Sequence, residues 1–301
     1  MDSHHPETAC AGQQAFSSLD KLWKLHTSPP SSNLSPKVPT TSPERLASIS
    51  RKTILYLAYG SNLSSETFKG ARGIRPLSAI SAHIPSLTLT FDLPGIPYLE
   101  PCFANTAYRA PPSSTDYHKD RWHKGLIGVV YEVTPEDYRT IIATEGGGAS
   151  YQDIEVPCYA IPAGSKTVDD GEKGTPFLAH TLLLPRDEEK SGTTAGPQRP
   201  DPSYAQASAR YLKLITDGAD EHSLPAEYTA YLYAIRPYTI TTKRQKAGQA
   251  LFLAFWAPFI LAMFGLGKAL AGDDGRVPGW FASLMALLFR GMWASYDAVY
   301  K

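Results

Sequence analysis

The pattern of apolar and polar positions along the chain predicts several β-strands in its middle part. Residues 86–91 alternate apolar and polar side chains, which is the pattern of a strand with one buried face. Continuous apolar, β-prone runs at 53–58, 126–133 and 177–184 are typical of strands that are buried on both faces.

Capping and breaking residues predict two helices after these strands. Residues 203–217 begin with a serine suited to a helix cap and stop before Gly218. Residues 225–236 begin with a proline and end before Pro237. Strands and helices together indicate a mixed α/β fold.

Composition changes on both sides of this middle part. Residues 1–50 are rich in Ser, Pro and Thr, and we expect them to be disordered because they bury too little apolar surface to offset their ordering entropy. They lack the basic start and apolar core of a secretory signal peptide. The sequence therefore predicts a leader at 1–50, a domain at 51–242 and a hydrophobic helical tail at 243–301.

The tail contains two apolar segments separated by a polar turn. Residues 247–267 are 21 residues without a charge, long enough to cross the hydrocarbon core of a bilayer as a helix. Residues 277–300 form a second apolar segment, which Arg290 interrupts. The pattern predicts a helical hairpin and membrane association through residues 247–300.

Three basic residues, Lys243, Arg244 and Lys246, precede the first apolar segment. By the positive-inside rule they would keep the preceding domain in the cytosol, tethered to the membrane by the tail. The alternative is a pair of amphipathic helices that lie at a membrane surface or pack on the domain of a soluble cytoplasmic protein.

Charge and cysteine content exclude several classes of function. Lys and Arg total 29, as do Asp and Glu, so no basic field is present to attract nucleic acid. The three cysteines are scattered and form no CxxC pair, which argues against a disulfide framework and against a zinc site. No metal is implied.

An apolar run that ends in a tight turn is the most informative local feature. Its residues are Tyr56, Leu57, Ala58, Tyr59, Gly60, Ser61 and Asn62. Glycine permits backbone angles closed to other residues, and short polar side chains favour turns. Successive backbone N–H groups in such a turn can bind a carboxylate or an oxyanion. A plain structural turn would have the same sequence.

A helix is predicted between residues 134 and 145, with Thr134 as its N-cap and Glu145 at its other end. The three glycines at 146–148 would terminate it. Glu145 would then lie beside unsatisfied backbone carbonyls, which disfavour its charged form and suit a general acid or base. A solvated residue at a helix end is the alternative interpretation.

Four motifs in the same order resemble the γ-glutamyl cyclotransferase family. The first is the Tyr-Gly-Ser-Asn turn at 59–62, and the second is a Gly-Val-Val strand at 128–130 that leads through a helix to Glu145 and a glycine. The third is a Tyr-x-x-Ile-Glu-Val strand at 151–156, and the fourth extends from Tyr211 to Tyr228. The resemblance covers residues 53–242, and residues 68–107 look most like the fungal members, some of which serve gliotoxin-type sulfur metabolite pathways.

The resemblance implies a small β-barrel with flanking helices, and a catalytic domain at 51–242. It implies release of 5-oxoproline from a small-molecule γ-glutamyl substrate, without a cofactor. It assigns Glu145 as the catalytic residue, and the turn residues 56–62 together with Tyr211 as the substrate-binding residues. For Tyr151, a catalytic role and a core-packing role both remain open.

Other functions remain as alternatives. One is a γ-glutamylamine cyclotransferase, which uses the same pocket on a different leaving amine. Another is a binding module without activity on the same fold, although Glu145 at the catalytic position argues against it. A serine hydrolase is disfavoured because Ser61 does not lie in a G-x-S-x-G elbow.

Overall fold

The computed structural model describes residues 38–47, 52–109, 122–145, 152–184, 206–270, 272 and 277–300. These residues fall into two compact units, which divide between Tyr238 and Thr239. This division lies close to the predicted start of the tail.

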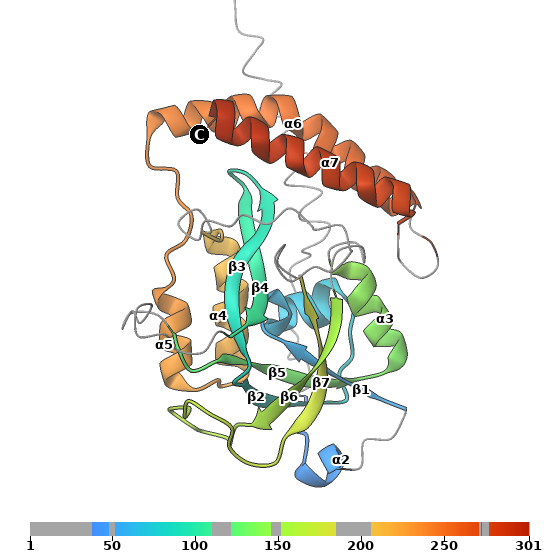
Figure 1. The fold of residues 1–301 in the computed structure, drawn as a ribbon, viewed down its shortest axis with the longest axis vertical. Helices are drawn as coiled ribbons and strands as arrows, with labels where there is room; N and C mark the ends of the chain where they lie inside the picture. The colour runs from blue at the N-terminus through green and yellow to red at the C-terminus, as the bar shows by residue number, and fades with distance from the viewer. Residues whose placement is uncertain are drawn as a thin grey trace, which may run out of the picture. The chain divides into compact units, whose positions relative to one another are not determined.

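The first unit is built on a closed barrel of five strands (Figure 1). The strands follow the order β1 (Ile54–Ala58), β5 (Leu126–Val133), β2 (Ser78–Ile84), β6 (Gln152–Ala160) and β7 (Phe177–Leu183). Neighbouring strands pair in antiparallel fashion, and a parallel pair between Tyr56 and His180 closes the barrel. The mixed α/β fold with a small barrel, expected from the sequence, is therefore confirmed.

A separate two-stranded sheet extends from the barrel in Figure 1. It consists of β3 (Leu87–Ile96) and β4 (Glu100–Tyr108), with a shift in register between Thr90 and Leu93. Asn105 stabilises this irregular part, because its amide nitrogen donates to Asp92 and its amide group exchanges hydrogen bonds with the backbone of Leu184. The strand predicted at 86–91 is thus the first half of a longer strand.

The longer helices of the unit are α3 (Pro135–Thr144), α4 (Ala209–Glu221) and α5 (Ala226–Ala234). The predicted cap of α3 is confirmed, since the Thr134 hydroxyl accepts from the Asp137 N–H at 3.1 Å. The prediction that Gly218 ends α4 is wrong, because the helix continues to Glu221. Gly218 instead allows close contact: a Cβ there would lie 2.4 Å from the carbonyl carbon of Leu63.

Ten residues of the predicted leader are ordered. Thr40 pairs with Ala79 on β2, and α2 (Pro43–Ala47) follows. The buried Thr41 donates its hydroxyl to Ser78, and Arg45 donates to Glu132. Residues 38–47 therefore correct the predicted disorder, while residues 1–37 lie outside the described part of the chain.

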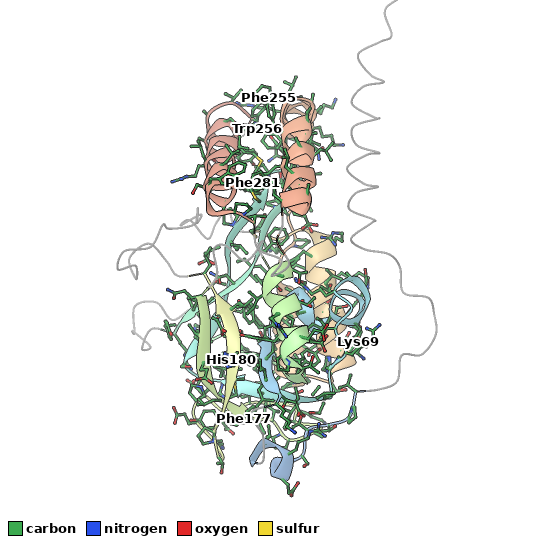
Figure 2. The ribbon with its side chains drawn as sticks, turned by 90° about the vertical axis from the view of Figure 1, so that its right-hand side faces the viewer. Lys69, Phe177, His180, Phe255, Trp256 and Phe281 are labelled. Carbon is green, nitrogen blue, oxygen red and sulfur yellow. The ribbon has the colours of Figure 1, made fainter. Side chains whose placement is uncertain are left out.

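The tail forms a helical hairpin, as predicted, from α6 (Lys243–Leu270), α7 (Gly279–Ser295) and a final turn, η6 (Tyr296–Tyr300). The indole of Trp256 donates to the Ser295 hydroxyl at 2.9 Å, and Phe281 is buried (Figure 2). Within the described residues, one helical segment, 243–267, is long and apolar enough to cross a membrane, with a mean hydropathy of 2.0.

Candidate functional site

The turn after β1 is a short 3₁₀ helix, η1 (Ser61–Leu63). The carbonyls of Gly60 and Ser61 accept from the N–H groups of Leu63 and Ser64 at 3.0 and 3.1 Å. These two N–H groups are therefore used within the turn. Tyr59 anchors the turn to the barrel by donating its hydroxyl to the carbonyl of Leu182 at 2.7 Å.

Gly60 is closely surrounded by residues of other elements. Its φ is −106° and its ψ is −139°, a combination outside the usual α and β regions. A Cβ at this position would lie 3.2 Å from the hydroxyl of Tyr211 and 3.4 Å from the Cβ of Ala104. Gly60 thus lets α4 and β4 approach the turn closely.

Tyr211 lies in the first turn of α4, and its hydroxyl reaches this crowded point. The hydroxyl accepts from the N–H of Ala104 at 3.1 Å, and the ring packs edge-on against Phe103 with ring centres 5.1 Å apart. Burial raises the pKa of Tyr211 above its ordinary value. The residue therefore stays protonated near neutral pH, where it connects the turn to the two-stranded sheet.

Glu145 ends α3 with an extended backbone, and its N–H donates to the carbonyl of Ile141. Its side chain is 21% exposed. The carboxylate oxygen Oε1 accepts from Asn62 Nδ2 at 2.7 Å and from Arg72 Nη2 at 2.7 Å. The structure therefore brings together the predicted catalytic residue and the last residue of the predicted turn.

Arg72 is the third residue of the hydrogen-bonded group that Glu145 and Asn62 form, and it is not part of the four sequence motifs. It directly follows the π-helix η2 (Glu66–Ala71), and its side chain is only 12% exposed. Its guanidinium lies against the Glu145 carboxylate, with Nη2 2.7 Å from Oε1.

Tyr56 is a buried core residue that contacts Asn62. Its hydroxyl accepts from Asn62 Nδ2 at 2.8 Å, and its ring stacks on Phe68 with ring centres 6.1 Å apart. Burial, together with the nearby charge of Glu145, raises the pKa of Tyr56 above its ordinary value. A protonated phenol is thus held beside the Asn62 amide at neutral pH.

Leu57 and Ala58, which were also predicted to bind substrate, have buried side chains in the barrel core. The carbonyl of Leu57 accepts from the Thr181 hydroxyl at 3.0 Å. These two residues therefore hold β1 in place. Tyr151 lies outside the described residues. Within the described ranges, no group of three or more His, Cys, Asp or Glu side chains could hold a metal ion.

Comparison with known proteins gives matches along most of the chain. A family model described as the AclK C-terminal domain matches residues 242–301. The chain is 32% identical over 254 residues to the gamma-glutamyl cyclotransferase gliK of Aspergillus fumigatus, an alignment that covers 82% of this chain and 86% of that protein. It is also 32% identical over 257 residues to the gamma-glutamyl cyclotransferase aclK of Aspergillus oryzae, with 83% and 88% covered.

A solved structure of a gamma-glutamyl cyclotransferase, 23% identical, has a TM-score of 0.44 and covers 64% of this chain and 93% of its own. The fungal relatives are more informative, because their similarity extends over more than four fifths of both chains. Together with the motifs that surround Glu145, this similarity shows that the chain belongs to the γ-glutamyl cyclotransferase family.

Proposed function

We propose that this protein releases 5-oxoproline and a free amine from a γ-glutamyl compound, with Glu145 as the acid–base residue. In this reaction the α-nitrogen of the substrate attacks its own γ-carbonyl carbon, and the bond from that carbon to the leaving nitrogen breaks. Because the nucleophile belongs to the substrate, the enzyme mainly has to hold the reactive conformation and move protons.

Proton transfer is the part of the reaction that needs a carboxylate. The attacking ammonium group carries three protons, of which one remains on the lactam nitrogen and two reach the leaving amine, which departs as an ammonium ion. A carboxylate can accept a proton from the first nitrogen and return it to the second. The observation that carries the proposal is the position of the Glu145 carboxylate, 2.7 Å from Asn62 in the signature turn.

The turn residues are proposed to hold the glutamyl end of the substrate. The buried hydroxyl of Tyr56 contacts Asn62 in this turn, and the buried hydroxyl of Tyr211 lies next to Gly60. Donors at such a position could stabilise the oxyanion of the tetrahedral intermediate. Tyr151 is retained as an additional candidate from the family resemblance.

The leaving amine is proposed to come from an amino acid, a peptide or a glutathione-derived adduct. The resemblance to fungal members supports a role in sulfur secondary-metabolite biosynthesis. The test is to incubate purified full-length protein with γ-glutamyl amino acids, γ-glutamyl peptides, glutathione S-conjugates and γ-glutamylamines, and to detect 5-oxoproline by mass spectrometry.

We expect 5-oxoproline from at least one of the first three classes. Release from γ-glutamylamines alone would favour the γ-glutamylamine cyclotransferase alternative. Binding of these compounds without any product would instead identify a binding module on the same fold, and would overturn the proposed activity.

We also propose that the hairpin tethers the catalytic domain to the cytosolic face of a membrane. Both helices are apolar on their packed side and on their exposed side, which is typical of a helix surrounded by lipid. The exposed apolar side chains include Leu251, Phe255, Phe259, Phe264 and Leu266 on α6 and Trp280, Leu284 and Leu287 on α7. Fractionation of cells and extraction at high salt test this location.

A further inference from the structure

We infer that Arg72 is a positioning residue that fixes one oxygen of Glu145 and leaves the other for proton transfer. This inference rests on the proposed cyclotransferase reaction and deepens it. It concerns an arginine 73 residues away in sequence from the carboxylate that it contacts.

The two oxygens of Glu145 have different surroundings. Oε1 accepts two hydrogen bonds, from Arg72 Nη2 and from Asn62 Nδ2, both at 2.7 Å. No side chain or backbone group within the described ranges forms a hydrogen bond with Oε2. A carboxylate held in this way cannot rotate freely, so Oε2 is the atom that keeps a constant position for exchange with the substrate nitrogens.

Arg72 is itself held at several points. Its second terminal nitrogen, Nη1, donates to the hydroxyl of Thr144, and its backbone N–H donates to the carbonyl of Thr67 at 3.0 Å. The guanidinium therefore joins two consecutive side chains, Thr144 and Glu145, at the end of α3. Its planar fork suits this two-point contact, whereas the single ammonium group of a lysine does not.

Two buried polar atoms suggest that this group is more than a structural ion pair. Arg72 Nε and Asn62 Oδ1 are both buried without a hydrogen-bond partner among the described residues. Buried polar groups are normally satisfied in a purely structural network, and those that are not often belong to functional sites. Both atoms belong to side chains that contact Glu145.

During the reaction, the fixed carboxylate would work as follows. Oε2 takes one proton from the α-ammonium group, which frees the nitrogen lone pair to attack the γ-carbonyl carbon, and gives that proton to the leaving nitrogen. It then takes the second proton from the attacking nitrogen and passes it to the leaving amine as the old bond breaks. Arg72 and Asn62 hold Oε1 throughout, so both transfers occur from one position. A displaced base can lower turnover by about 100-fold even when substrate still binds.

The test compares Arg72→Gln and Arg72→Lys with the matched control Arg75→Gln in the full-length protein. Arg75 lies three positions further along the chain, and its side chain donates to the carbonyls of Lys69 and Ile74 and not to Glu145. We expect Arg72→Gln to lower kcat by about 100-fold with KM within about 3-fold of wild type. Arg72→Lys keeps the charge and should recover part of the loss, and Arg75→Gln should behave like wild type.

A second measurement does not require turnover. Carbodiimide reacts with carboxyl groups that are free to accept it, and its labelling of Glu145 can be followed by peptide mass spectrometry at a fixed pH. Loss of the guanidinium should speed labelling of Glu145 several-fold in Arg72→Gln, with no change in Arg75→Gln. Thermal unfolding of each variant shows whether it is folded.

The two measurements separate the possible failures. If wild type forms no 5-oxoproline but Arg72→Gln labels faster, the proposed reaction is wrong and the control of Glu145 by Arg72 stands. If Arg72→Gln is folded and matches wild type in kcat and in labelling rate, the inference about Arg72 is overturned. An equal loss of kcat in Arg72→Gln and Arg75→Gln would also overturn it, because it would indicate a general structural effect.

Discussion

Asn62 Nδ2 lies 2.7 Å from Glu145 Oε1, although the two residues are 83 positions apart in the sequence. Asn62 belongs to the turn after β1, and Glu145 ends α3, which packs on that strand. The turn and the carboxylate are therefore parts of one site.

The crowding around Gly60 predicts that Gly60→Val lowers activity more than Ser61→Ala. A Cβ at Gly60 would already lie 3.2 Å from the Tyr211 hydroxyl, and valine adds two methyl groups at this point. Steady-state kinetics of both variants, with thermal unfolding as a check on the fold, measures the difference. Should Ser61→Ala be the more damaging, the Ser61 hydroxyl would have a direct role that the present account does not give it.

Glu132 links the ordered N-terminal segment to the barrel in a pH-dependent way. Burial alone favours its protonated form, but hydrogen bonds from Arg45, Ser78 and Thr53 hold the pKa of Glu132 below its usual 4.5. A lowered pKa in the folded state means that this stabilisation is complete above the unfolded pKa and is lost as pH falls through the folded value.

We therefore expect Arg45→Ala to lower the free energy of unfolding slightly at pH 7, since Arg45 is about half exposed, and by less at pH 3. Urea unfolding at the two pH values measures this change. Arg139→Ala is a suitable control, because Arg139 is exposed and its Nε donates to the carbonyl of Pro135 within its own helix. An equal loss at both pH values would contradict the assignment to Glu132.

The tail is expected to decide where the enzyme is located and not what it catalyses. The hydrogen bonds that the structure describes around Glu145 come from Asn62 and Arg72, which belong to the barrel unit. Truncation after Thr242 should yield a soluble protein that still forms 5-oxoproline, whereas full-length protein should pellet with membranes and resist extraction by carbonate. A full-length protein in the soluble fraction, combined with an unfolded truncated form, would instead identify the tail as a packed structural element.

Arg290 makes a full crossing by α7 less favourable than one by α6. Its side chain is exposed, and an arginine in the middle of a spanning helix costs about 3 kcal/mol on insertion scales. The location of α7 at the membrane surface or within it can be distinguished by the accessibility of single cysteines placed at exposed positions such as Leu284 and Leu287.

Strands that consist of continuous apolar residues can be predicted from the sequence. All eight residues of β5 are buried, and β1 and β7 also agree with the predicted runs. The pattern does not indicate β4, because this strand carries the buried polar residues Glu100 and Asn105. Their partners, such as Ser208 and Arg210 for Glu100, come from distant parts of the chain and become apparent only in the folded structure.

The candidate site also has some residues that the sequence predicts and others that only the folded structure shows. Glu145 and the turn at 56–62 could be predicted, because each has a local signal in the form of a helix end or a strand that stops at Gly-Ser-Asn. Arg72 could not, since its role depends on contact with Glu145 and Thr144 across more than 70 positions. Gly218 has the sequence signal of a helix stop, and its actual role cannot be predicted because the Leu63 backbone that crowds it is also remote in sequence.

The most direct test of the account is the rate of 5-oxoproline release by Glu145→Gln, compared with wild type on a substrate that wild type converts. Glutamine keeps the size of the side chain but cannot exchange protons as a carboxylate does. We predict a loss of at least about 100-fold in kcat, with substrate binding and thermal unfolding close to those of wild type. Turnover within a few-fold of wild type would remove Glu145 from the mechanism and contradict the account.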